Sequence, residues 1–265
     1  MKKLTLSEIW IYPIKSLGGI RLDTSRVMPK GLEHDRRWML VDEDGVFMTQ
    51  RVFPKMALCK VSFHGPHFRI SFDTHSIDLP VGMHEQDSIK AQVWDDSVSV
   101  FEVSRDHNQW FSDMLGLKCR LVYFPENNIR LVDPRYRIHE TDETSLSDAY
   151  PFLIIGQSSL DDLNRRLPSP IPMNRFRPNF VFTGGAPYEE DAWRNFKISE
   201  NRFVAVKPCA RCVMTTVNQD TSEKSPEPLK TLSTYRKKEN KILFGQNVVA
   251  LDYASISVGD VITLN

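Results

Sequence analysis

Long apolar runs are missing from this sequence. A membrane-spanning helix needs about 20 consecutive, mostly apolar residues, and no segment of the 265-residue chain approaches that length. The N-terminus has Lys2 and Lys3 but reaches Glu8 too early for the apolar stretch of a signal peptide. We therefore predict a protein without a membrane segment, located in the cytoplasm.

Cysteine is scarce, and a net charge is absent. Four cysteines in a chain of this length do not form a disulfide framework, which fits a reducing compartment. Lys+Arg and Asp+Glu both number 34, whereas nucleic-acid-binding domains carry a strongly basic face. The composition therefore argues against a nucleic-acid partner.

Internal repeats, low-complexity tracts and linkers rich in Gly, Ser and Pro are absent as well. Instead, short runs of alternating apolar residues recur between turn residues, which is typical of strands. Two hairpin turns are predicted, at Asp42-Glu43-Asp44-Gly45 and at Gly65-Pro66. The first third of the chain is therefore predicted to consist mainly of short strands.

Three segments are predicted to be helical, at residues 106–115, 158–167 and 228–235. Ser158 is the predicted N-cap of the second helix, because a serine hydroxyl can accept a hydrogen bond from a free N–H of the first turn. The acidic run at residues 189–191 is predicted to be a solvated turn. The resulting fold class is mainly β with peripheral helices.

Residues 125–147 contain few periodic apolar residues. We place a domain boundary at the start of this segment, which divides the chain into domains 1–124 and 125–265. The same segment carries a basic cluster that is either a solvated loop or a substrate-facing one, formed by Arg130, Arg135 and Arg137.

The most informative segment runs from residue 207 to residue 221 and contains Cys209-Ala210-Arg211-Cys212. Thiolates are soft ligands that suit copper, zinc and molybdenum, and an adjacent guanidinium favours the thiolate. Structural zinc usually needs four ligands, and neither the other cysteines nor any histidine is suitably spaced. A thioredoxin-type pair would open a helix, whereas residues 213–217 are predicted to be a strand. A metal ligand and two inert cysteines both remain open.

Three further motifs place cationic and polar side chains at predicted strand ends, namely residues 12–16, 31–38 and 174–179. Alone, each is explained most simply by a solvated edge or a structural contact. Lysine supplies a point charge, and arginine a rigid fork that binds phosphate through two hydrogen bonds. A single pocket that combined these groups would suit a phosphorylated small molecule; its members would be Lys15, Ser16, Arg36 and Arg177.

Taken together, these motifs resemble the MOSC proteins, named after the C-terminal domain of molybdenum cofactor sulfurase. Among them, the chain is most similar to the mitochondrial amidoxime-reducing components and their bacterial relatives. Residues 11–16 and 31–38 resemble the N-terminal β-barrel domain of the family. Four segments resemble the MOSC domain, at residues 148–151, 176–179, 209–221 and 244–247. The resemblance implies an N-terminal β-barrel domain followed by a MOSC β-barrel domain.

The resemblance also implies a molybdenum cofactor, which is a pterin dithiolene with a phosphate and a molybdenum that carries oxo ligands. Cys212 is then the metal ligand and the catalytic centre, and Cys209 is a structural neighbour. The residues that match cofactor contacts of the family are Lys15, Ser16, Arg36, Arg177, Asn179, Arg211 and Asn247.

The activity implied by the resemblance is the reduction of small N-hydroxylated compounds. No iron–sulfur cysteine pattern occurs in the chain, so electrons are expected from a separate ferredoxin, flavoprotein or cytochrome. The alternative is a molybdenum cofactor carrier or sulfur-transfer protein that bears a persulfide on Cys212.

Overall fold

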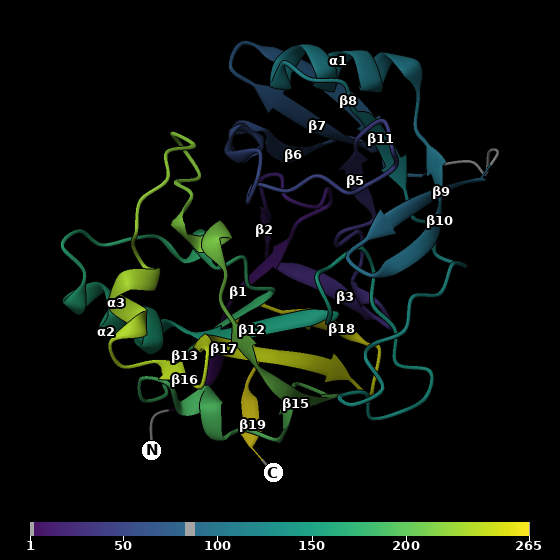
Figure 1. Ribbon diagram of the computed structural model, residues 1–265. Helices are drawn as coiled ribbons and strands as arrows, with labels where there is room; N and C mark the ends of the chain where they lie inside the picture. The colour runs from purple at the N-terminus through teal and green to yellow at the C-terminus, as the bar shows by residue number, and fades with distance from the viewer. Residues whose placement is uncertain (1–2, 83–87, 265) are drawn as a thin grey trace.

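The computed structural model describes residues 3–82 and 88–264, and it is mainly β, as predicted. Figure 1 shows two β-rich halves, with α1 (Arg105–Leu115) across the top of one half. The helices α2 (Gln157–Arg166) and α3 (Leu229–Ser233) lie beside the other half. None of the helices in the described part of the chain has the length and apolar character needed to cross a membrane.

The largest sheet of the described residues contains nine strands and is built mostly from the second half of the chain. Its order is β19 (Ile262–Leu264), β14 (Asn195–Ile198), β15 (Asn201–Ala210), β17 (Lys241–Ala250), β12 (Phe152–Gly156), β13 (Phe180–Thr183), β1 (Thr5–Ile11) and β2 (Ile20–Leu22), with β16 (Lys237–Lys238) beside β17. Only β12 and β13 pair in parallel, and α2 connects them. The other pairs in this sheet are antiparallel.

Hydrogen bonds between the two ends of the chain close this sheet. The Leu6 N–H donates to the Asp260 carbonyl at 2.9 Å, and the Ile262 N–H donates to the Leu4 carbonyl at 3.0 Å. The start of β1 therefore lies beside the start of β19, and the sheet curves into a barrel.

Aromatic side chains fill the interior of this barrel. Phe152 stacks on Phe180 with ring centroids 5.4 Å apart, and Phe196 stacks on Phe203 at 5.5 Å. All four side chains are buried, and complete burial of one phenylalanine contributes about 1.5–3 kcal/mol. Along these strands, residues that face the barrel interior alternate with residues that face away from it.

The other half contains two smaller sheets packed around a second core. One has the order β5 (Trp38–Val41), β11 (Arg120–Tyr123), β10 (Asp96–Glu102), β9 (Ser88–Val93), and the other is β6 (Lys60–His64), β7 (His67–Phe72), β8 (His75–Pro80). The predicted turn at Gly65-Pro66 is confirmed, since His64 pairs with His67. The helix predicted at residues 106–115 is confirmed as α1, which Ser104 caps.

Strands from the start of the chain also join the second half. β1 pairs with β13, and β3 (Thr24–Met28) lies between β4 (Gly31–Leu32) and β18 (Ser255–Ser257). The chain passes from this region to β5 and returns at β12 through residues 125–147, which form no strand or helix. The division at residues 124 and 125 stays a prediction.

Two local predictions around α2 are wrong. The N-cap of α2 is Gly156, not Ser158. The carboxylate of Glu190 takes the capping role, because it accepts hydrogen bonds from the Gly156 N–H at 3.1 Å and the Ser159 hydroxyl at 2.9 Å. Glu190 lies in the short 3₁₀ turn η3 (Glu189–Ala192) and is fully buried, whereas Asp191 is exposed, so the prediction of a solvated turn is wrong for Glu190. Burial raises the pKa of Glu190.

The strand predicted at residues 213–217 is also wrong. The segment is the 3₁₀ turn η4 (Val213–Thr216), and similar turns occur at η1 (Pro54–Leu58) and η2 (Met173–Arg175). The Thr215 and Thr216 hydroxyls donate to the carbonyls of Cys212 and Val213 at 3.0 and 2.7 Å. Such local bonds compete with strand pairing, and here they outweigh the β propensity of the side chains.

Gly245 in β17 provides a test of this packing. Its φ is +80°, and a Cβ there would lie 2.7 Å from Ile155 Cγ1 and 2.9 Å from the Ile154 carbonyl oxygen. We expect Gly245→Ala to lower the free energy of unfolding by about 2–4 kcal/mol, because overpacking adds to left-handed strain. Gly259→Ala is the control, since Gly259 has φ +98° and no atom within 4 Å of its Cβ position. Urea denaturation should show a smaller loss for the control, and equal losses would contradict the packing argument.

Candidate functional site

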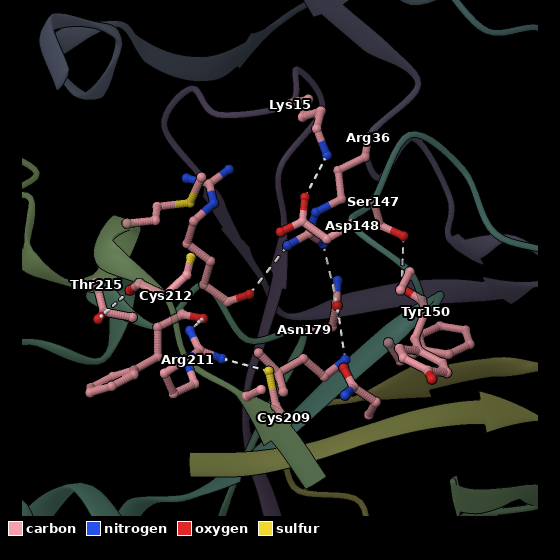
Figure 2. A pocket seen from close by; sticks show the side chains of 18 of the residues that line it. Lys15, Arg36, Ser147, Asp148, Tyr150, Asn179, Cys209, Arg211, Cys212 and Thr215 are labelled. Carbon is pink, nitrogen blue, oxygen red and sulfur yellow. Dashed lines mark hydrogen bonds and ion pairs between the residues drawn. The ribbon is translucent and has the colours of Figure 1, made fainter. Parts of the chain in front are cut away.

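A pocket of about 170 Å³ lies between the two halves, and Figure 2 shows it from close by. The structure brings all eight predicted site residues to its wall, namely Lys15, Ser16, Arg36, Arg177, Asn179, Arg211, Cys212 and Asn247. The first three precede β5. Arg177 and Asn179 lie between η2 and β13, Arg211 and Cys212 follow β15, and Asn247 lies in β17. Segments that are far apart in the sequence therefore converge on one cavity.

Three of these residues have an unusual backbone conformation. Ser16, Arg36 and Arg177 have φ values of 66°, 53° and 55°. Residues other than glycine rarely adopt positive φ, and those that do often lie at functional sites, where the surrounding structure compensates for the strain. Each of the three motifs thus turns sharply at the residue that reaches the pocket.

The buried carboxylate of Asp35 holds these turns together. It accepts hydrogen bonds from the Tyr12 N–H at 2.7 Å, from Asn179 Nδ2 at 3.0 Å and from Arg36. The Tyr12 ring lies against the guanidinium groups of Arg36 and Arg177, at 4.5 and 4.1 Å from its centroid. Burial lowers the pKa of Arg177 to about 10, so this side chain remains a cation at neutral pH.

Asn179 plays a structural role in this cluster. Its Nδ2 donates to Asp35 and to the Trp10 carbonyl, and its Oδ1 accepts from the Leu153 N–H and from Arg36. The amide therefore has both donors and its acceptor engaged within the protein. Its contact with a cofactor stays a prediction.

The two cysteines of the loop contact different arginines. Arg211 Nη1 donates to Cys209 Sγ at 3.0 Å, and Arg211 Nη2 donates to the Phe176 carbonyl at 2.6 Å. Cys212 Sγ instead accepts a hydrogen bond from Arg51 Nε at 3.1 Å. Cys212 is the N-cap residue of η4. It therefore lies in the short connection between the end of β15 and this turn.

Sequence analysis missed Arg51. The residue follows Thr49 and Gln50 in a turn between β5 and η1, and no motif or spacing around it indicates a site. A lone arginine at a turn is usually a surface residue. Here the guanidinium contacts the sulfur of Cys212, which lies 161 positions later in the sequence. The local sequence around Arg51 does not indicate this contact.

Asp148 connects Arg51 to Lys15. Its carboxylate accepts a hydrogen bond from Lys15 Nζ at 2.7 Å and another from Arg51 Nη2, and the Asp148 side chain is half exposed. Burial lowers the pKa of Lys15 to about 8, an effect that Asp148 partly offsets. Partial loss of hydration would raise the pKa of this half-exposed carboxylate, but the cations of Lys15 and Arg51 hold the pKa of Asp148 well below its usual range.

Arg130 supports the loop that carries Asp148, so for this residue the solvated-loop alternative is wrong. Arg130 is buried, and its guanidinium donates to the carbonyls of Ser145, Ser147 and Asp148 at 2.8, 2.7 and 3.3 Å. It also forms an ion pair with Asp96. Arg135, in contrast, is exposed and pairs with Asp133.

Four pocket residues have buried polar atoms that find no hydrogen-bond partner within residues 3–82 and 88–264. They are Ser16 Oγ, Arg51 Nη1, Arg177 Nη2 and Arg211 Nε. A buried donor left unpaired costs free energy, more so on a charged group. An anionic ligand with several oxygen atoms would satisfy such a donor set, and Cys212 adds a soft sulfur. The residues present therefore fit a phosphorylated cofactor that carries a thiophilic metal.

Comparisons with known proteins identify two domains in this chain. Residues 3–118 match the MOSC N-terminal beta barrel domain, and residues 141–263 match the MOSC domain. The mitochondrial amidoxime-reducing component 1 of Mus musculus is 32% identical, over 98% of this chain and 82% of its own length. The same-named protein of Homo sapiens is also 32% identical with the same coverage.

The molybdenum cofactor sulfurase of Oryza sativa is 31% identical over 96% of this chain, which corresponds to 33% of the sulfurase. Two differently named groups of proteins thus share both domains with this chain. The chain belongs to the MOSC family, with a MOSC N-terminal β-barrel domain and a MOSC domain.

Proposed function

We propose that this protein binds the molybdenum cofactor and reduces N-hydroxylated compounds. The observation that carries the proposal is the set of four unpartnered donors beside Cys212 in one pocket. The relatives that match over most of their own length are named for the reduction of amidoximes, which are N-hydroxylated. Reduction of an N–OH group to N–H consumes two electrons and two protons and releases water. We propose a separate ferredoxin, flavoprotein or cytochrome as the electron donor.

In this proposal the cations hold the anionic part of the cofactor, and Cys212 provides the protein ligand to the metal. When bound, the cofactor supplies the redox chemistry, while the protein supplies orientation and electrostatics. Lys15, Ser16, Arg36, Arg177 and Arg211 would contact the cofactor, with Asn179 and Asn247 on the adjacent wall. Arg51 orients the Cys212 sulfur through its Nε–H and keeps one N–H free for the pocket.

The loop around Asp148 controls the charge beside the sulfur. Arg130 fixes the backbone of this loop, and the Asp148 carboxylate in turn fixes Lys15 and Arg51. Since the carboxylate is half exposed, it can also accept hydrogen bonds from a substrate. Pre-oriented groups of this kind need no reorganisation when a charged ligand binds.

A second candidate function is cofactor carriage or sulfur transfer. The match to molybdenum cofactor sulfurase over nearly the whole chain favours it. In that case Cys212 would carry a persulfide, which mass spectrometry of the purified protein would detect as an added sulfur atom on this residue. A reductase would instead retain the cofactor and turn over N-hydroxylated compounds.

The metal-ligand assignment is tested by a pair of cysteine variants. We expect Cys212→Ala to lower the reduction of an N-hydroxylated substrate by about 100-fold or more, because the metal loses a ligand. Cys209→Ala should retain most of the activity, since the Cys209 sulfur contacts Arg211 and is not the proposed metal ligand. Elemental analysis of both proteins, purified from a molybdenum-replete host, gives the molybdenum content. The opposite pattern in the two variants would refute the assignment.

Ser16→Ala tests the anion pocket without weakening the fold. Its hydroxyl is buried and unpartnered, so its removal should leave the free energy of unfolding unchanged or raise it. Cofactor occupancy should fall, because one donor to the ligand is lost. Ser145→Ala is the matched control: Ser145 Oγ is also buried and unpartnered, but the residue does not line the pocket. Equal occupancy in the two variants would argue against a role for Ser16 in binding.

Lys15 makes cofactor retention depend on pH. The protonated ammonium attracts an anion, and burial lowers its pKa to about 8. Binding should therefore weaken as the pH rises through this value, by up to about tenfold per pH unit. Molybdenum retained after dialysis at a series of pH values measures the effect. Lys15→Met should bind more weakly below this pH and lose this pH dependence, so that the two proteins converge at high pH; identical profiles would exclude Lys15 as the source.

A further inference from the structure

Trp94 occupies an unfavourable position at the tip of the β9–β10 hairpin. It has a φ of 57° and is 42% exposed. Glycine and asparagine are the usual residues for positive φ in a hairpin turn, and a bulky side chain there is a genuine outlier. The hairpin itself therefore does not explain a tryptophan at this position.

The surroundings of Trp94 connect it to the pocket. Its ring lies 4.6 Å from the Arg51 guanidinium and 4.9 Å from the Phe47 ring, and its Nε1 donates to Asp148 Oδ1 at 3.4 Å. Arg51 and Asp148 line the pocket, and Arg51 donates to Cys212. The indole is therefore separated from the Cys212 sulfur by a single side chain.

Two more exposed apolar residues lie next to pocket residues in the sequence. Val52 follows Arg51 and is 68% exposed, and Val213 follows Cys212 and is 50% exposed. Trp94 contacts Arg51, which donates to Cys212. Exposed apolar residues therefore accompany both pocket residues: Trp94 contacts Arg51, and the two valines are adjacent to Arg51 and Cys212 in the sequence.

We propose that Trp94 is a specificity-determining residue, which binds the planar ring of aromatic N-hydroxylated substrates while their N–OH group faces Cys212. This inference rests on the proposed function and names a substrate class for it. An aromatic face offers stacking to a planar ring but little to a small aliphatic group. The half-exposed Asp148 carboxylate lies beside the indole and can accept hydrogen bonds from the N–H and O–H groups of an amidoxime.

The test compares binding of benzamidoxime, which has a ring, with binding of acetamidoxime, which has none. Calorimetry on the holoprotein without an electron donor gives dissociation constants, because no turnover occurs. Trp94→Asn is the main variant, since asparagine removes the ring yet tolerates positive φ, so the turn should fold. Trp94→Phe retains a ring. Reduction of both compounds is assayed separately with a chemical reductant, so a failure of the proposed function is recognised independently.

We expect Trp94→Asn to bind benzamidoxime about three- to tenfold more weakly and acetamidoxime as the wild type does. Trp94→Phe should retain most of the preference for the aromatic compound. Equal weakening of both ligands would overturn the proposal, because it would indicate a general effect on the pocket through Arg51. Unchanged benzamidoxime binding in Trp94→Asn, or no benzamidoxime binding by the wild type, would overturn it as well.

Discussion

The buried carboxylate of Asp35 is the interaction on which the site depends. It accepts hydrogen bonds from the turn after β1, from the motif that contains Arg36 and from Asn179 at the start of β13. A buried carboxylate needs several donors to offset the loss of its hydration, and here three different segments provide them. Removal of this charge would leave Arg36 and Arg177 facing each other across Tyr12 without a counter-ion in the same cluster.

The pocket is built at some cost to stability. Residues in left-handed conformations, unpartnered buried donors and a concentration of cations all raise the free energy of the folded protein. The two hydrophobic cores on either side provide the stability that tolerates these features. Stable cores beside a less stable pocket are expected of a ligand site, because polar groups already hydrogen-bonded within the protein cannot also bind a ligand.

Much of this arrangement follows from the sequence. Alternating apolar residues predicted the strands, and the cationic motifs at strand ends predicted a common pocket. Arg51 and Asp148 could not be assigned in the same way, because their roles depend on partners that only the tertiary structure brings near. The turn after Cys212 was missed for a different reason. There, the β propensity of Val and Thr favours a strand. The threonine hydroxyls instead donate to carbonyls three residues earlier, and these hydrogen bonds stabilise a 3₁₀ turn.

The closure of the large sheet has a consequence for how the chain folds during synthesis. β1 can pair with β2 as soon as both leave the ribosome, but its other edge needs β13, and its first residues need the segment before β19. Until those segments appear, a strand rich in isoleucine and tryptophan has an open edge, which is a known starting point for misassembly. The barrel is completed only after nearly the whole chain has been made. Its assembly should accordingly be slow and dominated by long-range contacts.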